Sequence, residues 1–103
     1  MGKNKLIKSL GKRIGNIVIH KILIKYTNMP ESLHHLKSEV ETYRDNVMES
    51  SQEFNWSDKD KLEIKSLALE KFKKDMKNFY SDIKFPEKEP DILIDETIKE
   101  CII

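Results

Sequence analysis

The chain has 103 residues and a formal net charge of +1, with 36% charged residues and only three glycines and three prolines. This length leaves room for a single domain, residues 1–103, and the composition favours helices joined by few turns. The single cysteine, Cys101, excludes an internal disulfide, and no run of about 18 apolar residues is present to span a membrane, so we expect a cytoplasmic protein that folds by packing alone.

The charge is distributed unevenly along the chain. The stretch from Lys3 to Tyr26 contains seven basic residues and no acid, whereas Met29 to Ile103 contains twelve basic and eighteen acidic residues. Such an asymmetry indicates an electrostatic contact, either within the molecule or with a partner.

The first 26 residues predict one helix. Its first part is amphipathic, and the apolar side consists of Leu6, Ile7, Leu10, Ile14, Ile17 and Val18. Gly11 and Gly15 weaken the helix, but their spacing would let another helix approach closely. Ile17–Tyr26 is apolar on all sides, so it is either a buried continuation of the helix or a β-strand that begins at Gly15 and Asn16. We favour one helix over about residues 3–26, because a lone strand has few possible partners here.

A second helix is predicted over about residues 30–53. Asn28, Pro30 and Glu31 are typical of a helix start. A narrow apolar seam with spacings of three and four follows, formed by Leu33, Leu36, Val40, Tyr43, Val47, Ser50 and Phe54.

A third helix is predicted over about residues 57–83, with Ser57 as its N-cap and acids in its first turn. Its main seam consists of Leu62, Leu69, Phe72, Met76, Phe79 and Ile83, widened by Ala68 and Tyr80. Ile64 and Leu67 lie on the opposite side, which predicts that other elements cover this helix twice and that it is the structural centre.

Pro86 and Pro90 predict the end of the third helix and an extended, solvated linker between them. Asp91 then caps a short final helix whose apolar face contains Ile94, Ile98, Cys101 and Ile102. The sequence thus predicts an all-α fold, a small antiparallel helical bundle of three main helices plus a short C-terminal helix. Because the apolar seams exceed the needs of one such core, a homodimer is plausible.

The sequence carries little sign of chemistry. His20, His34, His35 and Cys101 have no spacing that brings two metal ligands onto one helical face, and no nucleotide-binding or hydrolase motif is present. We therefore expect no metal site, no cofactor and no catalytic residue.

One short stretch has an enzyme-like pattern. The segment Arg13-Ile-Gly-Asn-Ile-Val-Ile-His20 resembles the Arg, four to six residues, His motif of HEPN-domain ribonucleases. The resemblance covers eight residues, and it implies RNA cleavage with Arg13 and His20 as the catalytic residues and Asn16 as a polar companion.

The main hypothesis is a non-enzymatic interaction or assembly module that contacts itself or a protein partner through the basic N-terminal helix. The alternative is a nucleic-acid-binding protein in which Lys5, Lys8, Lys12 and Arg13 contact phosphates from one helical face. These cations could equally be solvated and complement acids on the second helix.

Overall fold

The computed structural model describes residues 2–26 and 33–102, and these residues form four helices without a strand. The helices are α1 (Lys3–Tyr26), α2 (Leu33–Ser51), α3 (Asp58–Phe79) and α4 (Glu89–Cys101). The predicted all-α bundle of three long helices and a short C-terminal one is confirmed. The predicted helix start at Asn28, Pro30 and Glu31 lies outside the described residues, and α2 ends two residues before the predicted position 53.

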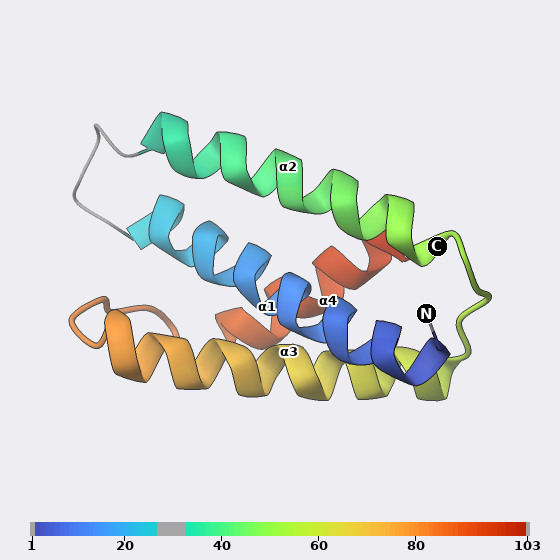
Figure 1. Cartoon of the computed structure of the whole chain (residues 1–103). Helices are drawn as coiled ribbons and strands as arrows, with labels where there is room; N and C mark the ends of the chain where they lie inside the picture. Colours follow the sequence, from blue (N-terminus) through green and yellow to red (C-terminus); the bar gives the residue numbers. More distant parts are fainter. Residues whose placement is uncertain (1, 27–32, 103) are drawn as a thin grey trace.

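Consecutive helices run in opposite directions, so that α1 and α3 point the same way (Figure 1). The helix α1 is continuous from Lys3 to Tyr26, and the alternative of a strand from Ile17 is therefore wrong. The C-terminal half of α1 can be apolar on all sides because α2, α3 and α4 all pack against this helix.

The structural centre is α1 and not α3, contrary to the prediction. Eleven residues of α1 are buried, compared with four residues of α3. The helices α2 and α3 lie on either side of α1 and do not contact each other, while α4 packs against all three (Figure 1).

The central position of α1 depends on its two inner glycines. A Cβ atom on Gly11 would lie 2.6 Å from the Cβ atom of Leu67, and one on Gly15 would lie 3.0 Å from the carbonyl oxygen of Ala68. Both distances are shorter than an ordinary van der Waals contact, so the helices α1 and α3 pack with almost no side chain between them. The predicted role of the glycine pair in a close helix approach is confirmed.

This close contact determines which face of α3 points inward. The buried residues are Ile64, Ala68, Phe72 and Met76. Leu62 and Phe79, which the sequence pattern assigned to the core seam, are 67% and 71% exposed. The assignment was wrong for these two residues, because the buried face of α3 combines Phe72 and Met76 of the predicted main seam with Ile64 of the opposite stripe. This face lies against the two glycines of α1.

The two ends of α3 differ in how well they were predicted. Ser57 is the N-cap, its hydroxyl accepts a hydrogen bond from the Asp60 N–H at 3.1 Å, and Asp60 reciprocates. The helix ends at Phe79, four residues before the predicted position 83. The linker predicted between Pro86 and Pro90 is solvated, with Glu87 and Lys88 exposed, but it is a turn and not extended, because the Glu89 N–H donates to the Pro86 carbonyl oxygen at 3.1 Å. The helix α4 begins at Glu89, before the predicted cap Asp91.

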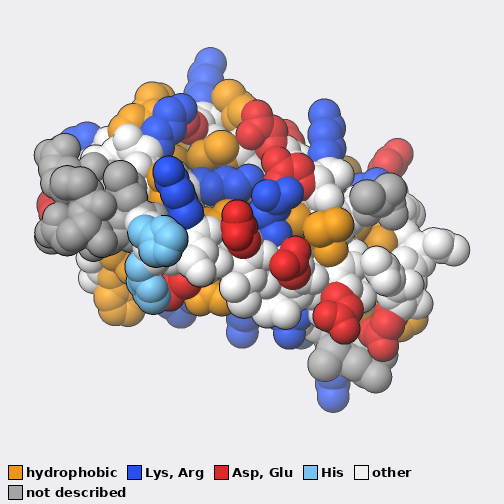
Figure 2. Space-filling model, turned by 90° about the horizontal axis from the view of Figure 1, so that it is seen from above, with side chains coloured by type: hydrophobic (Ala, Val, Ile, Leu, Met, Phe, Trp, Pro, Cys, Tyr) orange, Lys and Arg blue, Asp and Glu red, His pale blue; other side chains and the backbone are white. Residues whose placement is uncertain are grey.

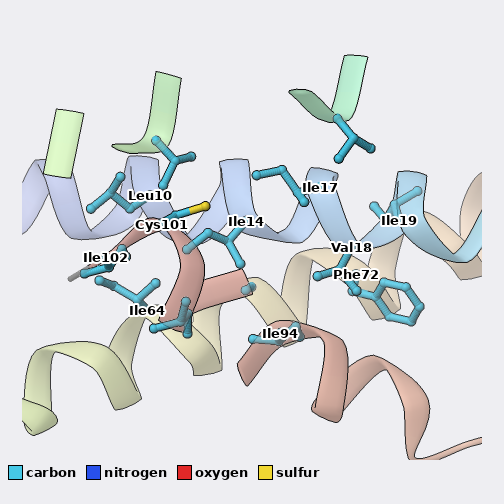
Figure 3. Packing of buried hydrophobic residues seen from close by; sticks show 14 of the residues in the cluster. Leu10, Ile14, Ile17, Val18, Ile19, Ile64, Phe72, Ile94, Cys101 and Ile102 are labelled. Atoms are coloured by element: carbon cyan, nitrogen blue, oxygen red, sulfur yellow. The ribbon is translucent and has the colours of Figure 1, made fainter. Parts of the chain in front are cut away.

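The core is one cluster to which every helix contributes. Figure 3 shows part of it, with labelled residues from α1, α3 and α4 facing the same interior. The largest fully buried side chains are Leu10, Ile14, Ile17, Val18, Ile22, Val47, Ile64, Ile94, Thr97, Cys101 and Ile102. Since α4 supplies several of them, it is a full member of the bundle.

Candidate functional site

All four predicted phosphate contacts are exposed, and three of them have no partner among the described residues. Lys5, Lys8 and Lys12 are exposed on α1, and none of them forms an ion pair with a described residue. Arg13 is different, because its Nη1 donates a hydrogen bond to the Ser50 hydroxyl of α2 at 3.0 Å. Glu49 of α2 and Glu53, two residues beyond the end of α2, line the same shallow hollow as Arg13.

Lys3, Lys21 and Lys25, three other cations of α1, contact polar groups of the same chain. Lys3 Nζ lies 2.8 Å from Asp60 Oδ2, and Lys21 Nζ donates to the buried Thr97 hydroxyl at 2.9 Å. Lys25 pairs with Glu89, and the hydrogen bond between them raises the pKa of Lys25 and lowers the pKa of Glu89. Part of the charge asymmetry along the chain is therefore an internal contact of α1 with α3 and α4.

Arg13 and His20, the pair that resembles the ribonuclease motif, both face α2. The His20 Nδ1–H donates to the Asn16 carbonyl oxygen at 2.7 Å, and Nε2 lies 2.5 Å from Glu39 Oε2. Tyr43 covers the ring edge-on at 5.4 Å between centroids. Both ring nitrogens are thus occupied, and Asn16 contributes its main-chain carbonyl to this arrangement.

One of the two remaining histidines shares its partner with His20. His34 and His35 are exposed, and His35 Nε2 lies 2.8 Å from Oε1 of Glu39, whose other carboxylate oxygen contacts His20. Within residues 2–26 and 33–102, no three His, Cys, Asp or Glu side chains are grouped as a metal site. Cys101 is buried, and burial raises the pKa of its thiol.

The surface that includes α2 carries acids and bases in close alternation (Figure 2). One such pair of opposite charges is Arg44 and Glu100. The Nε atom of Arg44 lies 3.2 Å from Glu100 Oε2, and it forms no hydrogen bond with a described residue. Like charges are not gathered on this side in the way that binding to a polyanion requires.

A more distinctive feature is a groove between α3 and α4. Its larger hollow has a volume of 760 Å³. The apolar lining consists of Leu69, Phe72, Met76, Phe85, Pro90 and Ile92. Ile92 is 55% exposed at the edge of this hollow. Phe85, which belongs to the connection between α3 and α4, packs edge-on against Phe72 of α3. Concave apolar surfaces of this size are the usual sites for ligands or partner side chains.

A smaller hollow of 470 Å³ continues the groove toward the start of α3. Leu62 and Ile98 supply its apolar part. Lys65 marks the division between the two hollows, because its Nζ lies 3.2 Å from Asp91 Oδ1 and 3.0 Å from Asp95 Oδ1 across the groove. These carboxylates raise the pKa of Lys65, with Asp95 the larger contributor. We call the two hollows together the α3–α4 groove.

The α3–α4 groove was not predicted from the sequence. Leu62 and Leu69 were placed in the core seam, and the helix pattern alone gives no sign that they line an open surface. The available signal was the second apolar stripe on the same helix, formed by Ile64 and its neighbours, because one helix of a small bundle cannot bury both stripes fully.

No helix among the described residues is both long and apolar enough to cross a membrane. Comparisons with known protein families, with curated protein sequences and with solved structures found no match for this chain.

Proposed function

We propose that this chain is a non-enzymatic protein-interaction module, and that the α3–α4 groove is its contact surface. The observation that carries the proposal is the apolar hollow of 760 Å³, which is open at the edge beside Ile92. Leu62, 67% exposed, extends the apolar surface along α3. Grooves of this kind between two helices accept the apolar face of a partner helix.

The basic helix supports the contact less well than the sequence suggested. Its C-terminal half is buried among the other helices, and Lys3, Lys21 and Lys25 have internal partners. The groove, by contrast, combines a concave apolar floor with charged groups at its edges, as is usual for protein interfaces.

An unbiased selection tests the proposed function. A display library of helical peptides without charge or sequence bias is selected on the full chain, and the binders are measured against two variants. Ile92→Lys places a charge at the edge of the larger hollow and should abolish binding. Phe79→Lys is the matched control, because Phe79 is 71% exposed but lines neither hollow. A library that yields no binder, or binders insensitive to Ile92→Lys, contradicts the proposal.

Nucleic-acid binding is the second candidate function. It is favoured by Lys5, Lys8 and Lys12, which are exposed and form no ion pair with a described residue. Contact of these three cations with phosphates would give an affinity that falls with salt, with a slope of about −2 to −3 in log K against log salt. A gel-shift titration over salt measures this slope, and absence of binding even at low salt removes the candidate.

The ribonuclease hypothesis has less support from the geometry. Glu39 and the Asn16 carbonyl hold both ring nitrogens of His20, which favours a role in joining α1 to α2. An RNase assay on the double variant Arg13→Ala and His20→Ala tests it, since cleavage by the wild-type chain that the variant loses would support catalysis.

A further inference from the structure

The shape of the α3–α4 groove specifies its occupant more closely than the proposed function does. Leu62 lines the smaller hollow and Leu69 the larger one, and these two residues are two helical turns apart on α3. Seven residues of a helix span about 10 Å, and side chains with this separation point in nearly the same direction. A straight helix that lies along the groove therefore reaches each hollow with one of two side chains seven residues apart.

The Lys65 bridge occupies the space between the two hollows. Its ion pairs with Asp91 and Asp95 cross the groove at 3.2 Å and 3.0 Å. A bulky side chain of the occupant cannot lie deep at this point without displacing the bridge. The occupant accordingly needs a small or polar residue between its two apolar anchors.

The edges of the groove have an excess of positive charge. Lys65, Asp91 and Asp95 together carry a net charge of −1 between the two hollows. The remaining cations in the lining are Lys61, Lys73, Lys88 and Lys99, and the remaining acids are Asp58 and Glu87, so the edges carry +2 and the lining as a whole carries +1. None of these six residues forms an ion pair with a described residue. An occupant with acids beside its apolar stripe complements these edges.

The edge lysines favour another protein as the occupant. A two-fold contact through this groove would place the same surface on both sides, and with a net charge of +1 on each copy the two linings gain no overall attraction. A segment with acidic flanks gains attraction at the edge lysines, so the charge pattern favours such a segment over a second copy.

From these observations we infer that the α3–α4 groove binds an acidic amphipathic helix of another protein, with two apolar anchors seven residues apart. This inference rests on the proposed function and names the partner class for the same groove. The edge lysines determine the charge of the partner, and the positions of the two hollows determine the spacing of its anchors. The Lys65 bridge determines which kind of residue lies between the anchors.

Three labelled peptides of matched length test the inference on the full chain by fluorescence anisotropy. The first is an alanine-rich helix with two leucines seven residues apart and glutamates on both flanks of the leucine face. The second has the same composition, but one leucine is moved to the opposite helical face. The third replaces each flanking glutamate with lysine. We expect at least about tenfold weaker binding of the second peptide, from the loss of one buried leucine, and about tenfold weaker binding of the third.

The variant Ile92→Lys should abolish binding of the first peptide, and Phe79→Lys should leave it unchanged. Equal binding of the three peptides, or preference for the lysine peptide, overturns the inference. So does a dimer in light scattering that Ile92→Lys converts to a monomer, because the occupant would then be a second copy. If the unbiased library yields groove binders while the acidic peptide fails, the partner class is wrong and the proposed function stands. If neither binds, the proposed function itself fails.

Discussion

Replacing the two inner glycines of α1 with alanine should weaken the fold, although alanine is the better helix former. In an exposed helix, a Gly→Ala substitution stabilises by about 1 kcal/mol. Here the new Cβ at Gly11 would lie 2.6 Å from the Cβ of Leu67, and the one at Gly15 would lie 2.8 Å from the Cγ of Lys71. A Cβ atom is fixed by the backbone, so relief of the first contact requires α1 and α3 to separate by most of an ångström.

Overpacking of a tight core costs about 1 to 3 kcal/mol, so a middle value of about 2 kcal/mol exceeds the gain in helix propensity. We expect Gly11→Ala and Gly15→Ala each to lower the free energy of unfolding by about 1 kcal/mol, which corresponds to a fall in Tm of about 4 to 8 °C for a domain of this size. Urea denaturation followed by far-UV circular dichroism and by the fluorescence of Trp56 measures the change.

Gly2→Ala is the matched control, because a Cβ atom there would meet nothing within 4 Å. It should change stability by less than about 0.5 kcal/mol. If Gly11→Ala and Gly15→Ala prove as stable as the wild type or more so, the close contact between α1 and α3 does not determine the packing, and the account of which face of α3 is buried fails with it.

Three further changes probe local features. Lys25 and the Tyr26 hydroxyl hold the pKa of Glu89 below its ordinary value. The stability that this carboxylate contributes is therefore present above pH about 4 and is lost as the pH falls through the lowered pKa. Glu89→Gln should reduce the acid dependence of the urea midpoint, and an unchanged dependence contradicts this. Ser57→Ala removes the hydroxyl of the capping box and should cost about 1 kcal/mol in urea denaturation, whereas equal stability would show that the cap is dispensable. Cys101 is buried and burial raises the pKa of its thiol, so reaction with a disulfide reagent should be slow in the native chain and fast in urea; rapid native labelling would show that α4 opens readily.

The local parts of the fold were predictable from the sequence because their signals are local. The bounds of α1 follow from helical periodicity, and the cap of α3 follows from Ser57 and Asp60 three residues apart. The choice between helix and strand at Ile17–Tyr26 was less certain, because a segment that is apolar on all sides shows no period of its own.

The groove was not predictable in the same way. The buried face of α3 takes residues from both apolar stripes, and it lies against Gly11 and Gly15, some fifty residues earlier in the chain. The short distance between α1 and α3 carries Ile64 and Ala68 into the core and leaves Leu62 at the surface. Periodicity describes both stripes equally well, so the outcome depends on a contact between distant segments.

The arrangement of α2 and α3 on opposite sides of α1 also determines how the energies of substitutions combine. Because α2 and α3 do not contact each other, a core substitution in one should leave the effect of a core substitution in the other nearly unchanged. Substitutions in α1 or α4 lack this independence, because both of these helices contact α2 and α3. Energetic coupling between α2 and α3 therefore runs through α1 and α4, and variation on the α3 side of the α3–α4 groove can accumulate without direct contact with α2.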